Sequence, residues 1–590
     1  MRLAQYYCAL LCASLTLVAP AFADTDSSAA RISPSTINWR ACYSDENPVF
    51  LCATLEVPLN YQARKNSPDA SKTTQLALIK LPAADNTQKP LGSLFINPGG
   101  PGGSGVDWLR AVGPHYFSQA LRNRYDLISF DPRGIHYSSP ITCQVPAENN
   151  APYYPSVDFP STPAQIKERI SVNKNLSALC AQNAAEIVQH MSTADVARDL
   201  DRLRQAVGDT QLNFVGYSYG SYIGATYANL FPERVGRMML DGVLDPIQWS
   251  TGRGFSGWLV PVSQRLASDY GSMATLHEFF RLCDLAGPAQ CHFAPNAAQR
   301  FEQLANSIKT QPIRLVTADG IEFEVDTALF INTVKSSLYS VWNWQNLADL
   351  LAFTEAGAPA AITAAHYTAL LDELTTNDPA PVPFDNNPLG FFSVLCSDTT
   401  NPRDAWIWPL AAVVAEHAAG YFGPSWTWNS SICATWPANQ LNRYTGPFSS
   451  RTRNTILIAN TLFDPATPYS GAHMMRRLLP NSRLLTLAGW GHTTPGLSTC
   501  IDAITETYLL TGATPSADTL CSQDVLPFNL TAEMDVFSGM PKTADAPPWV
   551  RNANKFLRLS EEEKKQRAIV GRALIKQILK PARDQLHPVH

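Results

Sequence analysis

Short apolar runs bounded by Gly, Pro or Asp recur along this chain, and several contain almost no polar residue. That pattern is typical of strands buried on both faces of a mostly parallel sheet. The strands it predicts are Gln75–Lys80, Ser93–Asn97, Asp126–Phe130, Leu212–Gly216, Arg237–Asp241, Thr455–Asn460 and Arg483–Leu487. Helical patterns lie between them. From Ser192 to Gly208, for example, apolar residues recur at three- and four-residue spacing and give a helix one apolar face.

From about Pro246 to Ser393 the strand rhythm weakens and the pattern becomes mostly helical. We interpret this segment as a cap inserted into a sheet domain, with strands resuming near Phe391–Cys396 and again at Thr455. The domain boundaries are then 35–245 for the first part of the sheet domain, 246–395 for the cap and 396–530 for the second part. The predicted fold class is α/β, a mostly parallel sheet with helices on both faces and an inserted, mainly helical cap.

The first residues have the three-part pattern of a secretory signal peptide. Arg2 supplies the positive start, a mostly apolar run covers residues 9–18, and Ala21-Phe22-Ala23 forms a cleavage site. The apolar run is too short for a membrane span. Residues 1–23 are therefore expected to be removed on export, which predicts a periplasmic or extracellular protein without an integral membrane span.

The C-terminal segment differs from the rest of the chain. Ser560 and Glu563 form a capping box at the start of a predicted helix, and apolar residues follow at four-residue spacing. Ten Lys or Arg and four Asp or Glu fall between Arg551 and His590. We interpret residues 545–590 as a basic helical tail, which either docks on the acidic body of the protein or contacts a membrane surface or a partner.

Composition narrows the class of protein. The chain has 590 residues, 45% of them hydrophobic and 16% charged, with a formal net charge of -5. Such a composition is globular and leaves no basic footprint for nucleic acid.

The cysteines indicate disulfides. Two of the 12 leave with the signal peptide, and the ten that remain are an even number in an exported chain. No Cys-x-x-Cys pair is present, so we expect no zinc site, no other metal and no cofactor. Sequence neighbours can pair as Cys42 with Cys52, Cys143 with Cys180, Cys283 with Cys291, Cys396 with Cys433 and Cys500 with Cys521, although spacing alone does not fix the connectivity.

Gly216-Tyr217-Ser218-Tyr219-Gly220 is a G-x-S-x-G nucleophile elbow. In this motif a strand turns sharply into a helix with the serine at the tip, and the flanking positions must be small because Cβ atoms would clash there. A predicted strand precedes Ser218 and a helical pattern follows it, which is the context that the motif requires. The N-terminus of that helix favours negative charge at the serine oxygen. We therefore predict Ser218 as a nucleophile.

A serine hydroxyl is a weak nucleophile and needs a base. In folds that carry a serine on such an elbow, the acid follows the serine in the chain and the histidine follows the acid. His492 lies on a Gly-rich loop directly after the last predicted strand and is the predicted general base. Asp464 lies in the loop after the preceding strand, where prolines stiffen the chain, and is the predicted acid that orients the histidine. Asp241 and Asp245 are the rival acids, although both fit structural turn positions better.

A glycine-rich run, Asn97-Pro-Gly-Gly-Pro-Gly-Gly-Ser-Gly105, follows another predicted strand. Glycines of this kind let the backbone approach a ligand closely. The run resembles a phosphate loop but lacks the Lys-Ser/Thr ending of that motif. With a serine elbow downstream, it instead predicts an oxyanion hole, a set of backbone N–H groups aimed at developing negative charge. The expected donors are Gly99 or Gly100 together with Tyr219.

In combination these motifs resemble a known family. The Gly-Gly-Pro-Gly run, Asp131-Pro-Arg-Gly134, the serine elbow, the Asp464 loop and the His492 loop look like those of the secreted tripeptidyl aminopeptidases, which belong with the proline iminopeptidase-like α/β-hydrolase serine peptidases. The resemblance runs from about Ile37 to Pro527, and the chain departs from it at His136, where relatives usually have Gly. It implies a secreted serine peptidase that removes short peptides or single residues from free N-termini through an acyl-enzyme on Ser218.

An aminopeptidase must also recognise a free ammonium group, which a carboxylate in or beside the cap does best. Asp398 is the candidate for this role, with Glu355 and Asp385 as alternatives. Two rival functions share the sequence features: an esterase or lipase would use the same catalytic residues, and a non-catalytic binding protein would use the same fold. The expected partners are peptides with free N-termini, and the sequence specifies no oligomeric state.

Overall fold

The computed structural model describes residues 37–540, except 45, 47, 65–66, 147, 317–321, 357–387, 439 and 539. The predicted signal peptide (1–23), the basic tail (545–590) with its capping box, and Asp385 lie outside the described residues. Among the residues that are described, no helix is long and apolar enough to cross a membrane.

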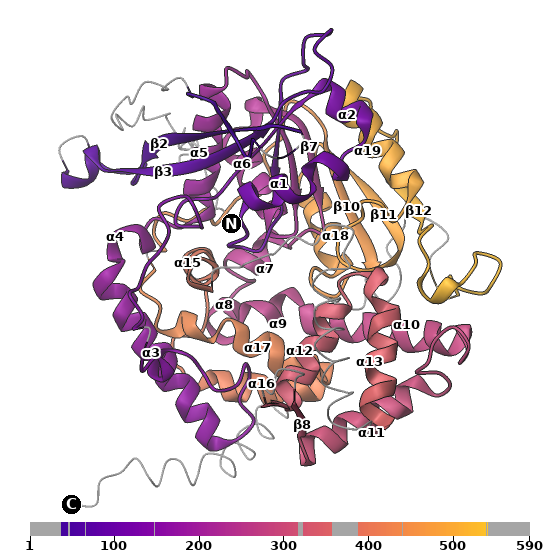
Figure 1. Ribbon diagram of the computed structural model, residues 1–590. Coiled ribbons are helices and arrows are strands. Elements are labelled where there is room, and N and C mark those ends of the chain that lie inside the picture. The colour runs from indigo at the N-terminus through magenta and orange to yellow at the C-terminus, as the bar shows by residue number, and fades with distance from the viewer. Residues whose placement is uncertain are drawn as a thin grey trace, which may run out of the picture.

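A ten-stranded sheet occupies the upper half of the molecule in Figure 1. In spatial order its strands are β1 (Arg40–Cys42), β2 (Phe50–Pro58), β3 (Thr73–Leu81), β5 (Asp126–Phe130), β4 (Ser93–Asn97), β6 (Leu212–Tyr217), β7 (Val235–Asp241), β10 (Ile456–Phe463), β11 (Ser482–Trp490) and β12 (Thr519–Ser522). The pairs from β1 to β5 are antiparallel, and every pair from β5 to β12 is parallel. The predicted mostly parallel sheet is therefore confirmed.

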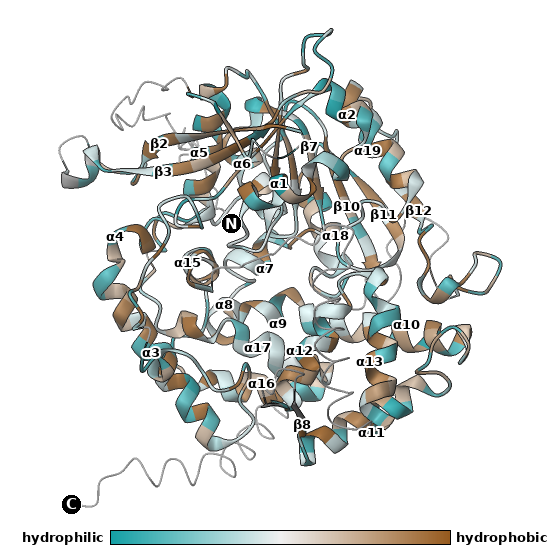
Figure 2. Ribbon diagram, viewed as in Figure 1, coloured by the Kyte–Doolittle hydropathy of each residue, from teal (hydrophilic) through white to brown (hydrophobic). Residues whose placement is uncertain are grey.

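Helices cover both faces of this sheet. On one face α1 (Gly105–Tyr116) and α19 (Thr499–Thr511) contribute to a core that includes Leu94 and Ile96 of β4. On the other face α5 (Thr193–Ala206), α6 (Tyr219–Leu230) and α18 (Tyr469–Leu478) contribute to a core that includes Phe95 of the same strand. Because successive strand residues point to opposite faces, an unbroken apolar run feeds both cores. The sheet strands accordingly appear mostly brown in Figure 2.

Every strand predicted from the sequence is present, but one further expectation is wrong. The apolar segment Phe391–Cys396, expected as a strand, belongs to the helix α15 (Pro388–Asp398). Every residue of this helix from Ser393 to Asp398 is buried, so its buried positions have no helical spacing of their own. A short apolar run has no periodicity that separates a buried helix from a buried strand. The sequence also missed β2 and the two edge strands β1 and β12, and the small antiparallel pair β8 (Ile313–Val316) and β9 (Glu322–Val325).

A mainly helical layer lies below the carboxyl edge of the sheet in Figure 1. Its helices include α7 (Pro246–Ser250), α8 (Ser256–Leu259), α9 (Val262–Leu266), α10 (Ser268–Ala286), α11 (Ala297–Thr310), α12 (Thr327–Ser337), α13 (Trp344–Ala356), α15, α16 (Ile407–Ala419) and α17 (Phe422–Asn429), and α3 (Pro163–Asn183) packs against them. Aromatic side chains from α10 and α11 share one core with Trp408 of α16 and Phe422 of α17. We therefore propose a cap that ends with α17 rather than at residue 395.

The disulfides join sequence neighbours. The structure pairs Cys42 with Cys52, Cys143 with Cys180, Cys283 with Cys291, Cys396 with Cys433 and Cys500 with Cys521. Of the connectivities that the sequence left open, the structure therefore has the nearest-neighbour pairing. Among the described residues, no group of three or more His, Cys, Asp or Glu side chains is placed to hold a metal ion.

Candidate active site

Parallel pairing brings the predicted site residues to one edge of the sheet. The strands β4, β6, β7, β10 and β11 are consecutive neighbours and run in the same direction. The carboxyl end of β4 leads into the glycine-rich run, that of β6 into Ser218, that of β10 into Asp464 and that of β11 into His492. Segments far apart in the sequence therefore meet where open α/β sheets bind their ligands.

The elbow around Ser218 has the strained geometry that its motif predicts. Ser218 has φ 54° and ψ −123°, a conformation that residues with a Cβ rarely adopt. A Cβ on Gly216 would lie 2.4 Å from the carbonyl oxygen of Gly220, and one on Gly220 would lie 2.6 Å from that of Asn97. Both motif glycines are therefore required sterically. Ser218 is partly exposed while its neighbours on either side are buried, and it makes no side-chain cap to α6.

His492 and Asp464 form a hydrogen-bonded pair. His492 Nδ1 lies 2.9 Å from Asp464 Oδ2 and 3.0 Å from Oδ1. Asp464 is 1% exposed. Because an ionised carboxylate only accepts hydrogen bonds, the imidazole proton must be on Nδ1, which leaves Nε2 as the free base. Burial lowers the pKa of His492, but the charge and hydrogen bond of Asp464, together with the charge of Asp241, outweigh it and raise that pKa above its ordinary value.

Thr467 contacts both residues of this pair, and the sequence patterns did not predict it. Its backbone N–H donates to Asp464 Oδ1 (2.7 Å) and its hydroxyl donates to Oδ2 (2.8 Å), while the N–H of Ala466 donates to Oδ1 (2.8 Å). The hydroxyl also lies 3.3 Å from His492 Nδ1. An aspartate that accepts from the backbone two and three residues on is a turn pattern visible in sequence, and Asp464-Pro-Ala-Thr467 fits it.

The cap holds the histidine loop in place. The backbone N–H of His492 donates to the carbonyl of Tyr339 (2.7 Å), and the two rings pack edge to face at 5.1 Å. Tyr339 follows α12, so a cap residue holds the backbone of His492. Gly491 has φ 99°, and a Cβ there would lie 3.1 Å from the same carbonyl. That contact explains the glycine before the histidine.

The rival acids have other partners. Asp241 is fully buried, accepts hydrogen bonds from the N–H and hydroxyl of Thr494 (3.0 and 2.6 Å), and has its pKa raised by burial to about 6. Asp245 caps α7 by accepting from the N–H groups of Ile247 and Gln248. Of the three carboxylates, Asp464 is the one that contacts His492, so the geometry favours it as the acid.

Residues at the end of β7 lie between Ser218 and His492. The carbonyl of Asp241 accepts the N–H of Ser218 (2.8 Å). Gly242 comes next, and a Cβ on it would lie 3.1 Å from His492 Cε1. Ser218 and His492 therefore flank the same two residues of one strand end.

The glycine-rich run packs directly against the elbow. Gly99 has φ 108°, and a Cβ on it would lie 2.8 Å from Ser218 Cβ and 3.3 Å from the backbone nitrogen of Tyr219. The N–H of Gly99 donates to Asn97 Oδ1 (3.1 Å). Since this donor is already used, Gly100 is the better candidate of the two expected glycines. Asp131 anchors the run by accepting from Ser104 Oγ (2.8 Å) and the N–H of Val106 (3.0 Å).

Asp398 does not lie where an ammonium receptor is expected. It is 1% exposed, and its carboxylate accepts from the N–H and hydroxyl of Thr193 (2.8 and 2.5 Å) and from Trp249 Nε1 (3.3 Å). Burial raises its pKa to about 6. The expected role in substrate binding conflicts with this placement, because the acceptor sites are filled from within the protein. The alternative candidate Glu355 is exposed and paired with Arg300.

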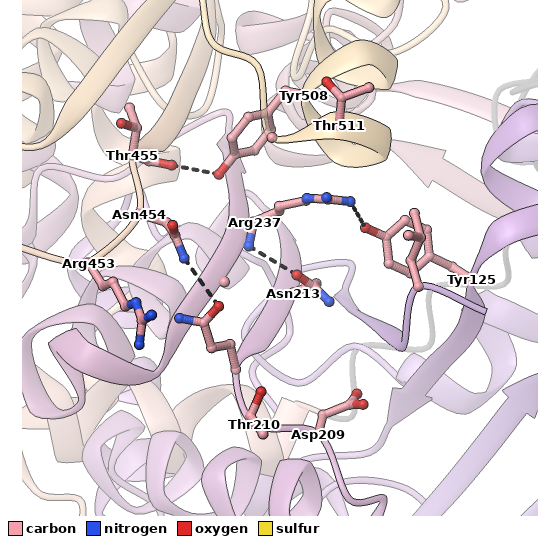
Figure 3. A pocket seen from close by; sticks show the side chains of 14 residues that line it. Tyr125, Asp209, Thr210, Asn213, Arg237, Arg453, Asn454, Thr455, Tyr508 and Thr511 are labelled. Atoms are coloured by element: carbon pink, nitrogen blue, oxygen red, sulfur yellow. Dashed lines mark hydrogen bonds between the residues drawn. The ribbon is translucent and has the colours of Figure 1, made fainter. Parts of the chain in front are cut away.

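A cavity of about 550 Å³ lies at the opposite edge of the sheet. Asn213 and Arg237, at the amino ends of β6 and β7, line it together with Thr455 beside β10. In Figure 3 the backbone N–H of Arg237 donates to Asn213 Oδ1 (3.0 Å), and its guanidinium donates to the hydroxyl oxygen of Tyr125 (2.7 Å). Ligands of parallel sheets bind outside the carboxyl ends of the strands. This cavity is therefore separate from the edge that carries Ser218.

The fold and the residues gathered at the carboxyl edge of its sheet together define a serine hydrolase of the α/β-hydrolase class. The description "alpha/beta hydrolase fold" matches residues 92–267, and "TAP-like protein" matches residues 419–521. The chain thus carries a match to the alpha/beta hydrolase fold followed by a TAP-like match, and its predicted resemblance to the tripeptidyl aminopeptidases is confirmed.

Three curated proteins are similar in sequence to most of this chain. It is 29% identical to "Tripeptidyl aminopeptidase" of Streptomyces coelicolor, over 85% of this chain and 88% of that protein. It is 28% identical to "Carboxylesterase B" of Mycobacterium tuberculosis, over 82% of this chain and 90% of that protein. It is also 28% identical to "Serine protease Hip1" of the same organism, over 82% of this chain and 91% of that protein.

Proposed function

We propose that this protein is an exported serine peptidase that removes short peptides or single residues from free N-termini. The observation that carries the proposal is the hydrogen-bonded Asp464–His492 pair at the same edge of the sheet as Ser218 on its strained elbow, in a chain similar to proteins named tripeptidyl aminopeptidase and serine protease. Five disulfides suit an oxidising compartment, which supports a periplasmic or extracellular location.

In the proposed mechanism Ser218 Oγ attacks the scissile carbonyl carbon. His492 Nε2 takes the hydroxyl proton, and the Asp464 carboxylate stabilises the imidazolium that forms. The N–H groups of Gly100 and Tyr219 stabilise the oxyanion of the tetrahedral intermediate. His492 then gives the proton to the leaving amine, which departs and leaves an acyl-enzyme on Ser218. A water molecule, activated by the same histidine, hydrolyses the ester and restores the serine.

Carboxylic ester hydrolysis is the second candidate. One relative is named "Carboxylesterase B", and the same three side chains suit both reactions. The paired acid and base disfavour the third possibility, a non-catalytic binding protein, because such a protein has no need of an aligned histidine.

The two candidates differ in how they treat the substrate N-terminus. A free ammonium held by a carboxylate contributes a charge-assisted hydrogen bond, and acetylation removes it. We expect acetylated peptides to have kcat/KM values about tenfold to a hundredfold below those of the free peptides. The measurement is kcat/KM on matched free and acetylated peptides, with simple esters as the control substrate. Equal cleavage of the two peptide series would favour the esterase or an endopeptidase.

A further inference from the structure

Asp398 ends α15, a cap helix whose sequence lies far from the elbow. Its carboxylate nevertheless reaches the first residue of α5: Oδ1 accepts the N–H of Thr193 at 2.8 Å, and Oδ2 accepts the Thr193 hydroxyl at 2.5 Å. The disulfide between Cys396 and Cys433 and a hydrogen bond from Arg443 to the carbonyl of Asp398 (3.2 Å) fix the end of the helix. The carboxylate is thus held against the first turn of α5.

The hydroxyl of Thr193 connects this carboxylate to Tyr219. Thr193 Oγ1 is hydrogen-bonded to the phenol oxygen of Tyr219. A threonine hydroxyl has one proton, and a carboxylate can only accept it, so the proton of Thr193 points to Asp398. Thr193 must then accept from the Tyr219 phenol. Ionised Asp398 therefore sets the direction of both hydroxyl groups, and the chain of bonds runs from Tyr219 through Thr193 to the carboxylate.

Trp249 contacts both the Asp398 carboxylate and the ring of Tyr219. Its indole Nε1 donates to Asp398 Oδ2 at 3.3 Å. Its ring lies 5.8 Å from that of Tyr219 and 5.9 Å from that of Tyr222. Tyr219 is 2% exposed, so its ring is held by packing as well as by its hydrogen bond.

We propose that Asp398 is a positioning residue for the oxyanion hole: through Thr193 and Trp249 it fixes the side chain of Tyr219, whose backbone N–H is aimed at the developing negative charge. The inference rests on the proposed mechanism, in which Tyr219 is one of the donors. If the Tyr219 N–H shifts by a fraction of a bond length, its hydrogen bond to the oxyanion weakens. The transition state loses more stabilisation than the bound substrate, because the negative charge develops in the transition state. Loss of the anchor then lowers kcat and leaves KM unchanged, for any acyl substrate.

Three variants cut the chain of bonds at successive points: Asp398→Asn, Thr193→Val and Tyr219→Phe. We expect each to lower kcat by about tenfold, less than the loss of about a hundredfold or more that follows complete removal of an oxyanion donor. The decrease should be equal for a free peptide and a simple ester, with unchanged KM. Thr193→Ser keeps the hydroxyl and should restore kcat. Combining Thr193→Val with Tyr219→Phe should cost no more than either change alone.

Asp209→Asn is the matched control. Asp209 also has its pKa raised by burial and accepts a backbone N–H, that of Ser93 at 2.9 Å, but it lies at the opposite edge of the sheet. Its substitution should leave kcat unchanged. If Asp398→Asn fails to fold, Tyr219→Phe still tests the inference, since it removes only a hydroxyl.

Each other outcome overturns a specific claim. Unchanged ester turnover in Asp398→Asn and Tyr219→Phe would refute the positioning role. A loss confined to free peptides would instead make Asp398 the ammonium receptor, and the aminopeptidase proposal would stand without the present inference. An enzyme that hydrolyses esters alone, and loses that activity equally in all three variants, would refute the peptidase proposal and uphold the positioning role.

Discussion

Asp464→Asn is the sharpest perturbation of the proposed triad. Both carboxylate oxygens of Asp464 lie near His492 Nδ1, at 3.0 Å for Oδ1 and 2.9 Å for Oδ2, but their other partners differ: Oδ1 accepts the N–H groups of Ala466 and Thr467, and Oδ2 accepts the Thr467 hydroxyl. An amide oxygen at the Oδ1 position keeps both backbone bonds, so the loop should survive. The amide NH₂ then faces His492 Nδ1 and donates to it. The imidazole proton is driven to Nε2, where a base is needed.

The wrong tautomer should lower kcat by about 10³- to 10⁴-fold, equivalent to about 4–5.5 kcal/mol of transition-state stabilisation. KM and the melting temperature should change little. The pKa of His492 is raised in part by the charge of Asp464, so the pKa should fall in the variant. Because the base must be neutral, the acid limb of the kcat/KM profile should move to lower pH.

Asp245→Asn is the control for this experiment. Asp245, like Asp464, accepts the backbone N–H groups two and three residues on, but it caps α7 and does not contact His492. Steady-state kinetics on a chromogenic ester and on a free peptide should show unchanged kcat. If Asp464→Asn retains kcat within about tenfold of the wild type, another carboxylate orients the base. Asp241, the second carboxylate whose charge acts on His492, would then be the residue to test.

Three further outcomes are expected. Burial raises the pKa of Asp269 to about 7, so ionisation of this carboxyl destabilises the fold as the pH rises through that value. Asp269→Asn should therefore raise the melting temperature more above pH 7 than below it. An equal rise at both pH values would contradict this. Replacing Cys143 and Cys180 by Ser should cost about 2–5 kcal/mol in the free energy of unfolding, and peptide mapping of the wild type without reductant should find no free thiol. Deletion of the chain beyond Asp545 should leave turnover of small substrates intact, because Ser218 and its partners lie upstream; a folded but inactive truncation would place the tail in the site.

Local sequence patterns encoded the backbone of the site. The glycines around Ser218 are dictated by contacts of 2.4 and 2.6 Å that a Cβ would make within the elbow and with the adjoining strand end, so the motif carries its own geometry. Unbroken apolar runs gave the parallel strands, and chain order gave the sequence of serine, acid and histidine. These features are short-range in the chain or repeat with a fixed period, which is why they are legible without a structure.

Partners that are distant in the sequence could not be read in this way. Tyr339 holds the backbone of His492 from the cap, and Thr193 meets Asp398 across 205 positions of the chain. Asp398 looked like a substrate ligand because an acid near a cap suits an ammonium group. The structure instead buries it behind the elbow, since the preceding apolar run folds as α15 and directs its last residue toward α5.

The sequence by itself determined the class of chemistry: a serine on an elbow, a histidine and an aspartate after later strands, and a glycine-rich run to approach the developing charge. Only the tertiary structure decided which carboxylate faces the histidine, which glycine N–H already has a side-chain acceptor, and which residues contact the side chain of Tyr219. The physical reason is that backbone conformation follows from neighbouring residues, whereas the hydrogen-bond partner of a buried side chain depends on strand order and on how the cap packs against the sheet.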